Sequence, residues 1–164
     1  MSSRTISSQL EGRPLADLTE QVARESAIHI DGGAFGDVYK CRRYTSGSSS
    51  LVAVKTPRYF ASEDPEENKR KLELNNKIVR RELGLLRRVE HSNTVPLLGV
   101  THGFGPTLAA VSPWMANGTL HSFLKNKGQT LSIVERLKLV HGIGSGLDYR
   151  AFSSLLGPFI FLIP

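Results

Sequence analysis

Two stretches decide the fold of this chain: DGGAFGDV at residues 31–38 and VAVK at residues 52–55. The first is a glycine-rich turn that follows the apolar run 27–30, and the second is a short apolar run that ends in lysine. Short apolar runs are typical of β-strands when turn residues bound them, and the Ser/Gly cluster at residues 45–50 is such a turn signal. The order strand, glycine turn, strand, Ser/Gly turn, strand predicts an antiparallel meander over residues 27–54.

The glycine-rich turn is a candidate phosphate-binding element, because small residues allow backbone N–H groups to approach an anion closely. A dinucleotide-binding fingerprint would need a helix directly after its last glycine and an acidic residue about 20 positions further on. Here a strand is expected next, and position 56 is Thr56. A P-loop needs Gly-Lys-Ser/Thr, which this chain lacks. There remain an ordinary turn and the glycine-rich hairpin that covers ATP in protein kinases.

Lys55 and Glu82 are the charged residues whose positions need an explanation. Lys55 ends an apolar strand, where a charge is costly unless it is paired. It follows the glycine turn at the spacing of the V-A-I-K motif, whose lysine holds the α and β phosphates of ATP. Glu82 falls inside the apolar stripe of a predicted helix and is the expected partner of Lys55. The alternatives are a lysine that reaches water and a glutamate on the helix surface.

A helix is predicted from Lys69 onward, after an acidic stretch that contains Pro65. Five of its residues fall within about 100° of one another on the helix: Ile78, Glu82, Leu85, Leu86 and Val89. The other faces carry most of the excess of basic residues, namely Lys69, Arg70, Lys71, Lys77, Arg80, Arg81, Arg87 and Arg88. We therefore interpret the formal charge of +6 mainly as a solvated helix face, and expect no nucleic-acid partner.

Shorter elements follow this helix. Residues 95–100 and 108–111 are predicted strands, and residues 120–125 a short helix. A second helix is predicted from Ser132, because Ser132 and Glu135 fit the S-x-x-E capping box. Its inner face would include Leu139, Ile143 and Leu147.

Composition places the chain among globular proteins, with 40% hydrophobic and 22% charged residues. Cys41 is the single cysteine, so neither a disulfide nor a cysteine-based metal site is expected, and a cytoplasmic location is favoured. The polar N-terminus does not fit a secretory signal. The apolar run at residues 151–164 is shorter than the roughly 20 residues of a membrane span, so no membrane partner is expected.

The ordered motifs resemble the N-terminal half of a protein kinase domain of the serine/threonine or tyrosine-kinase-like group, most of all the kinase-like proteins common in fungi. The segment RRELGLLRRVEHSNTVPLLGV (80–100) resembles the C helix and the following strand of that family. VSPWMANGTLHSFLK (111–125) resembles the hinge and the helix beyond it. LSIVERLKLVHGIGSGLDY (131–149) resembles the first long helix of the large lobe. The resemblance covers residues 28–149.

The resemblance implies an α+β fold: a small lobe with a five-stranded antiparallel sheet and a C helix, then the beginning of a helical large lobe. The expected organisation is a flexible segment at 1–22, a partial kinase domain at 23–149 and an apolar tail unlike the family at 150–164. Within the domain, the small lobe would run to about residue 112, the hinge over 113–118 and the large lobe from 119 to 149.

The resemblance also implies an ATP site. Its expected residues are Gly32, Gly33, Phe35 and Gly36 in the phosphate-covering turn, Val38 and Ala53 above the adenine, Lys55 with Glu82 as supporting ion pair, Ser112 at the gatekeeper position, and Pro113, Trp114 and Met115 in the hinge. The carbonyl of Pro113 and both backbone groups of Met115 would meet the adenine edge. Pro113 is tolerable because only its carbonyl is needed.

Several positions depart from the family pattern. Asp31 stands where the first glycine of G-x-G-x-x-G is expected, and Ser92 and Thr94 where the family often has Pro and Ile. The sequence contains no H-R-D-x-x-x-x-N, D-F-G or A-P-E motif. The catalytic base and the ligands for the Mg²⁺ that the family uses are therefore missing from these residues, and no metal site is expected in them. We expect family sequence to stop at Tyr149.

These observations predict the ATP-binding portion of a protein kinase that does not transfer phosphate by itself. The full-length family phosphorylates protein hydroxyl groups, but the protein substrate or regulatory partner of this chain is not indicated. The alternative prediction is a non-catalytic, pseudokinase-like binding or regulatory module.

Overall fold

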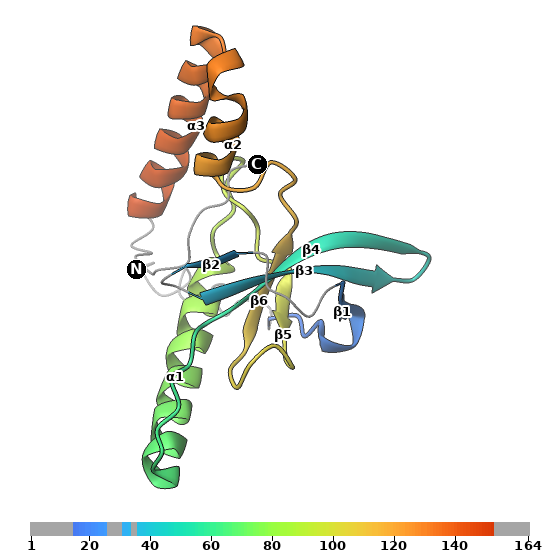
Figure 1. The fold of residues 1–164 in the computed structure, drawn as a ribbon, viewed down its shortest axis with the longest axis vertical. Coiled ribbons are helices and arrows are strands. Elements are labelled where there is room, and N and C mark those ends of the chain that lie inside the picture. Colours follow the sequence, from blue (N-terminus) through green and yellow to red (C-terminus); the bar gives the residue numbers. More distant parts are fainter. Residues whose placement is uncertain (1–14, 26–30, 34–35, 153–164) are drawn as a thin grey trace, which may run out of the picture.

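The described part of the chain combines one antiparallel sheet with three α-helices (Figure 1). The computed structural model describes residues 15–25, 31–33 and 36–152. The strands are β1 (Val22–Arg24), β2 (Asp31–Gly33), β3 (Gly36–Thr45), β4 (Ser48–Thr56), β5 (Gly99–Thr101) and β6 (Ala109–Pro113). The helices are α1 (Pro65–Leu86), α2 (Leu120–Lys127) and α3 (Ile133–Phe152), with 3-10 turns η1 (Thr19–Gln21) and η2 (Gly128–Thr130). The predicted α+β class is confirmed.

The sheet has the order β1-β3-β4-β6-β5, and β2 also pairs with β3. Because β4 occupies one side of β3, β1 and β2 both lie along its other side. The predicted strand at residues 27–30 lies outside the described residues. The predicted meander of β3 and β4 is confirmed, with nine cross-strand pairs from Asp37↔Thr56 to Thr45↔Ser48.

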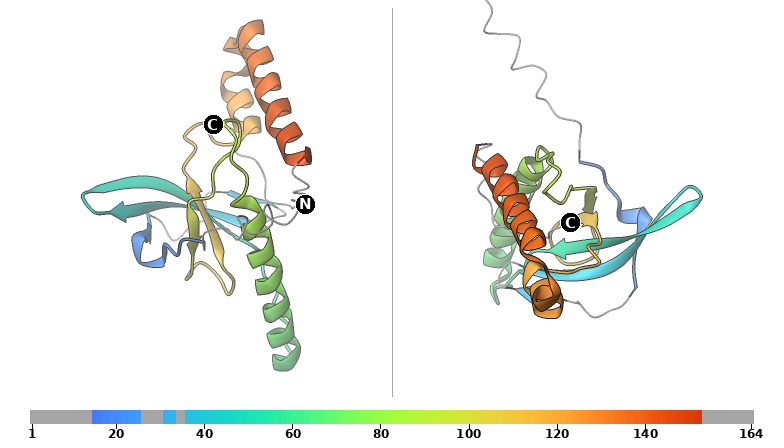
Figure 2. Two further views of the ribbon diagram at one scale, coloured as in Figure 1. Left: turned by 180° about the vertical axis from the view of Figure 1, so that it is seen from behind. Right: turned by 90° about the horizontal axis from the view of Figure 1, so that it is seen from above.

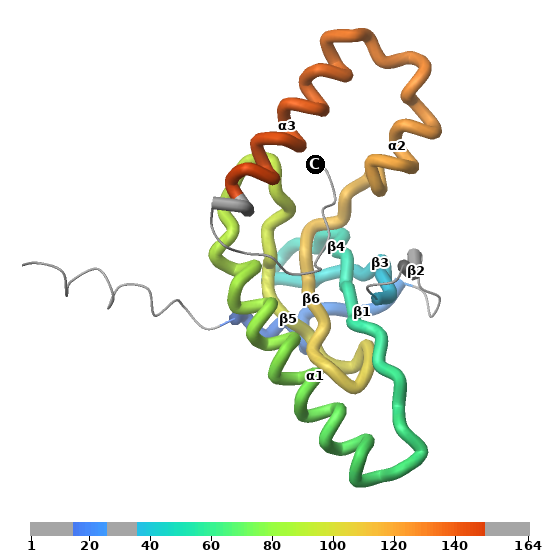
Figure 3. Tube along the Cα trace, turned by 90° about the vertical axis from the view of Figure 1, so that its left-hand side faces the viewer, coloured from blue at the N-terminus to red at the C-terminus, as the bar shows by residue number. Residues whose placement is uncertain are grey.

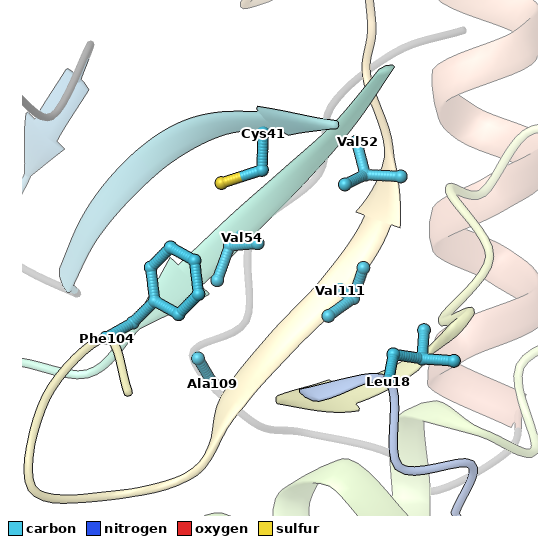
Figure 4. Packing of buried hydrophobic residues seen from close by; sticks show 7 residues of the cluster. All are labelled: Leu18, Cys41, Val52, Val54, Phe104, Ala109 and Val111. Atoms are coloured by element: carbon cyan, nitrogen blue, oxygen red, sulfur yellow. The ribbon is translucent and has the colours of Figure 1, made fainter. Parts of the chain in front are cut away.

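Hydrophobic residues pack against both faces of the sheet. On one face lies a cluster, the strap-side core, made of Leu18, Cys41, Val52, Val54, Phe104, Ala109 and Val111 (Figure 4). On the other face lies the helix-side core, made of Val79 and Leu83 from α1 with Val100, Leu108 and Ala110 from the sheet region. The alternation of side chains along a strand explains the division, because neighbouring residues point to opposite faces.

An N-terminal strap, residues 15–21, is part of this core, although residues 1–22 were expected to be a flexible segment. Leu18 is only 2% exposed, and its N–H donates to the Val100 carbonyl at 2.8 Å. The N–H of Val100 donates in turn to the carbonyl of Ala16, also at 2.8 Å. These bonds place the strap beside β5, where the burial of Leu18 offsets part of the entropic cost of ordering the segment.

Helix α1 begins at Pro65, four residues before the predicted start. Asp64 caps it by accepting the N–H of Glu66 at 2.9 Å, and proline suits the first helical position because its missing N–H has no partner there. The predicted apolar stripe is partly wrong. The fully buried residue is Leu83, which was not in the stripe, whereas Ile78 is 45% exposed.

Residues 95–98 do not form the predicted strand, since β5 begins only at Gly99. Pro96 has no N–H to give to a strand ladder. The predicted helix start at Ser132 is confirmed: the Ser132 N–H donates to Glu135 Oε2 at 2.8 Å, and the Glu135 N–H donates to Ser132 Oγ at 3.3 Å. Of its expected inner face, Leu139 and Ile143 are half-buried and Leu147 is 47% exposed.

The helical hairpin of α2 and α3 projects from one end of the sheet, whereas α1 extends past the other end (Figures 1 and 2). Helix α3 continues past Tyr149 to Phe152. It contacts the turn after α1, where the rings of His91 and Tyr149 stack with centroids 5.1 Å apart. A Cβ on Gly146 would lie 2.9 Å from the Asn93 carbonyl oxygen, so glycine permits this close packing.

Candidate functional site

The register of three strands brings four of the predicted site residues to one face of the sheet. Val38 pairs with Lys55 across β3 and β4, and Ala53 pairs with Ser112 across β4 and β6. Residues directly opposite each other in an antiparallel pair point to the same face. Lys55 also pairs with Ala110, which belongs to the helix-side core. Val38, Ala53, Lys55 and Ser112 therefore lie on the face that α1 covers.

Glu82 meets this face from α1, next to the fully buried Leu83. Partial burial raises the pKa of the Glu82 carboxyl above its usual value, because desolvation disfavours the ionised form. The positive charge of Lys55 acts on the same carboxyl and opposes the rise of its pKa. The structure thus brings Lys55 and Glu82 into electrostatic contact across the space between β4 and α1.

The glycine turn is closed by pairs of β2 with β3, from Asp31↔Val38 to Gly33↔Gly36. Gly36 has a φ of 134°, and a Cβ there would lie 2.3 Å from the Thr56 carbonyl oxygen. Both facts require glycine at this position, since side chains disfavour such a backbone and the collision is with a main-chain atom. Phe35, expected at the tip of the turn, lies outside the described residues.

The turn has an ion pair at its base that sequence reasoning missed. The Asp37 carboxylate accepts from Arg58 Nε at 3.2 Å and from Arg58 Nη2 at 3.0 Å. Arg58 lies 21 residues away in sequence, and only the pairing of Asp37 with Thr56 brings the two together. The pair compensates one of the negative charges in the glycine-turn sequence.

The segment after β6 forms a turn at the position predicted for the hinge. Pro113 is the last residue of β6, and the Trp114 N–H donates to the Leu51 carbonyl at 3.2 Å. The carbonyl of Met115 accepts the N–H of Gly118 at 3.0 Å, and Gly118 has a φ of 71°. Within the described residues the Met115 N–H has no hydrogen-bond acceptor, which leaves it available to a ligand.

The N-terminal strap was also missed by sequence reasoning. Its one signal is the pair Leu15 and Leu18, which are three residues apart in an otherwise polar segment. Leu15 packs against the helix-side core, and Leu18 belongs to the strap-side core. The strap thus reaches both hydrophobic clusters that hold β4 and α1 in place.

No group of three or more His, Cys, Asp and Glu side chains in the described residues is arranged to hold a metal ion. No helix in the same part of the chain has the length and hydrophobicity to cross a bilayer.

Comparison with known proteins gives a family match over most of the chain. The family model described as "Protein tyrosine and serine/threonine kinase" matches residues 25–155. Ephrin type-B receptor 1 of Gallus gallus is 28% identical over 123 residues, which are 74% of this chain and 11% of the receptor. The tyrosine-protein kinase transmembrane receptor Ror of Drosophila melanogaster is 31% identical over 122 residues, 71% of this chain and 16% of that protein.

A receptor-like protein kinase of Arabidopsis thaliana is 34% identical over 119 residues, 71% of this chain and 12% of that kinase. The matched regions are thus a small part, 11% to 16%, of these relatives' own length. The relatives include both a named tyrosine kinase and plant receptor kinases.

Proposed function

Because the chain belongs to the protein tyrosine and serine/threonine kinase family, we propose that residues 23–149 form the ATP-binding portion of a protein kinase domain. The observation that carries the proposal is the placement of Lys55 opposite Glu82, on the sheet face that begins at the Gly36 turn. An ammonium group held by a carboxylate beside a glycine turn suits the α and β phosphates of a nucleotide.

The adenine would lie between the sheet face and the hinge. Val38 and Ala53 offer an apolar surface for the base, and the half-buried Ser112 leaves room behind it. The free N–H of Met115 would donate to the adenine edge, and the carbonyl of Pro113 would accept from it. Gly32, Gly33, Phe35 and Gly36 would cover the phosphates from above, as the family's glycine turn does.

We propose that these 164 residues bind ATP without transferring phosphate. Phosphoryl transfer depends on positioning and on charge stabilisation by the catalytic-loop residues and Mg²⁺. The sequence contains neither the H-R-D-x-x-x-x-N motif nor D-F-G, so it has no base for the substrate hydroxyl and no Mg²⁺ ligands from those motifs. Phosphorylation of protein hydroxyl groups is the activity of the full domain in the family.

Replacement of Lys55 by methionine is expected to weaken ATP binding about tenfold or more, since a charge-assisted bond contributes roughly 1.5–3 kcal/mol. The measurement is thermal unfolding at increasing ATP. ATP at about 100 times its dissociation constant should stabilise the unaltered chain by about 2.7 kcal/mol. Lys125→Met, on the exposed surface of α2, is the matched control and should leave the shift unchanged. Equal shifts in all three proteins would contradict the nucleotide site.

Replacement of Glu82 by glutamine is expected to raise the melting temperature near pH 7 while it weakens ATP binding. The raised pKa means that the folded state disfavours the ionised carboxylate. The resulting loss of stability is absent below the unfolded-state pKa and is fully present above the folded-state pKa. A neutral amide removes that loss, so the gain in melting temperature should grow from about pH 4 to about pH 7. A constant difference across this range would refute the assignment.

The second candidate function is a non-catalytic binding or regulatory module. The observation that favours it is the exposed outer face of α1, which is basic and partly apolar. A chain that binds its partner but shows no thermal shift with millimolar ATP would fit this function.

We further propose a cytoplasmic location, because a single buried cysteine offers no disulfide and ATP is an intracellular nucleotide.

A further inference from the structure

Helix α1 has an outer face that no other part of the described chain covers. We define the α1 outer face as Leu74, Lys77, Ile78, Arg81 and Leu85 of α1, together with Arg88 in the turn that follows the helix. At 100° per residue the five helical residues lie within an arc of about 100°, on the side opposite the buried Val79 and Leu83. Figures 1 and 3 show α1 with the sheet on one side only.

The face carries an apolar row that is unusually accessible for residues of this type. Leu74 is 59% exposed and Ile78 is 45% exposed, and Leu85 is half-buried. Ile78 follows Leu74 by four residues, and Leu85 follows Ile78 by seven. At 1.5 Å per residue, the three side chains form a ridge about 16 Å long along the helix. A ridge of aliphatic side chains can pack into the groove between two side-chain rows of a second amphipathic helix.

A basic row runs beside the apolar row. Lys77, Arg81 and Arg88 are exposed, and none of their side chains has an ion pair or hydrogen bond within the described residues. Glu73 lies one turn before Lys77, but no salt bridge joins them. The carboxylate of Glu82 belongs to the inner side, where Lys55 acts on it. The outer face therefore presents positive charge that the fold itself leaves uncompensated.

The geometry points to a protein helix with an acidic flank as the occupant of the α1 outer face: we propose that this face docks an amphipathic, acidic helix of a partner protein. Charge complementarity selects acid groups beside the partner's aliphatic residues. The face contains no aromatic residue, whereas base stacking and insertion at a membrane interface both favour aromatic side chains. A nucleic acid would use the basic row but leave the apolar ridge without a role. A helix that lies in a membrane interface carries its charged residues on the face opposite its apolar residues, whereas here the two rows lie side by side within one arc of about 100°.

The test uses the full chain and a fluorescein-labelled synthetic peptide of about 16 residues, four helical turns. The peptide has leucines that match the ridge and glutamates on one flank. Fluorescence anisotropy should show saturable binding. Lys77→Glu with Arg81→Glu should weaken it about tenfold or more, because like charges then face each other. Leu74→Ser with Ile78→Ser should weaken it at unchanged net charge. Circular dichroism melting checks that each variant is folded.

The matched control is Lys69→Glu with Arg80→Glu, which changes the net charge equally at exposed positions of α1 outside the face. It should bind the peptide as the unaltered chain does. Equal weakening in this control would reduce the interaction to general charge attraction and overturn the proposal. So would the absence of saturable binding. Tighter binding to phosphatidylserine-containing vesicles or to oligouridine, with the same sensitivity to Lys77→Glu and Arg81→Glu, would reassign the face to a membrane or a nucleic acid.

Discussion

Replacement of Gly99 by alanine is expected to destabilise the chain by about 3 kcal/mol and to release the N-terminal strap from β5. A Cβ on Gly99 would lie 2.4 Å from the Ala16 carbonyl oxygen and 2.9 Å from the Leu18 side chain. Hydrogen bonds hold the main chains of the strap and of β5 close together. The added Cβ therefore fits only if the strap moves away from β5. Burial of Leu18 contributes about 1.5–3 kcal/mol, and each of the two hydrogen bonds to Val100 about 0.5–1.5 kcal/mol.

Chemical denaturation measures this loss, and a matched glycine provides the control. Gly144 lies in α3 with no atom within 4 Å of its Cβ position. Gly144→Ala should therefore be neutral or stabilise by up to about 1 kcal/mol, the difference in helix propensity. Leu18→Ala combined with Gly99→Ala should cost little more than Gly99→Ala alone, because both act through the strap. Full additivity of the two changes would show that the strap is not displaced.

Replacement of Leu83 by alanine is expected to destabilise the chain by about 3–4 kcal/mol, within the range for a buried leucine. Leu83 is 0% exposed and packs in the helix-side core with Val79, Val100 and Ala110. The cavity would form between α1 and the sheet, one residue along the helix from Glu82, so the position of that carboxylate relative to Lys55 should also change. Thermal unfolding should show the destabilisation, and ATP should produce a smaller shift than in the unaltered chain.

Ile78→Ala on the same helix is the control for Leu83→Ala. Ile78 is 45% exposed, so its truncation should cost less than about 1 kcal/mol. The comparison also discriminates between the two assignments of the helix face, since the sequence pattern placed Ile78 inside and omitted Leu83. A larger loss of stability for Ile78→Ala than for Leu83→Ala would show that the structural assignment is wrong.

The pair of strands β3 and β4 could be predicted because its signals are local. Gly36 and the apolar run that ends at Lys55 are adjacent to the turns that pair them, so the meander follows from short-range order. The face of α1 could not be predicted in the same way. Leucine and isoleucine occur on more than one side of the helix wheel, and Leu74, Ile78 and Leu85 form a second apolar row away from the buried one. Only contact with β5 and β6 selects Val79 and Leu83.

The site shows the same division between local and long-range information. The order of the motifs predicted Lys55 and Glu82 as an interacting pair. In the structure they lie on facing elements, β4 and α1. The pair of Asp37 with Arg58 and the packing of Leu18 were not found, because each depends on register between distant segments. Sequence periodicity carries no information about such contacts until the sheet order is known.

The N-terminal strap has a consequence for the behaviour of the molecule in solution. Without the strap, β5 would be the last strand of the sheet, and the N–H and carbonyl of Val100 would face outward without partners. An open strand edge of this kind is a template for pairing with a strand of another molecule. Because residues 16–18 occupy these groups, a chain that starts after Leu18 should self-associate through β5, and concentration-dependent light scattering would reveal this.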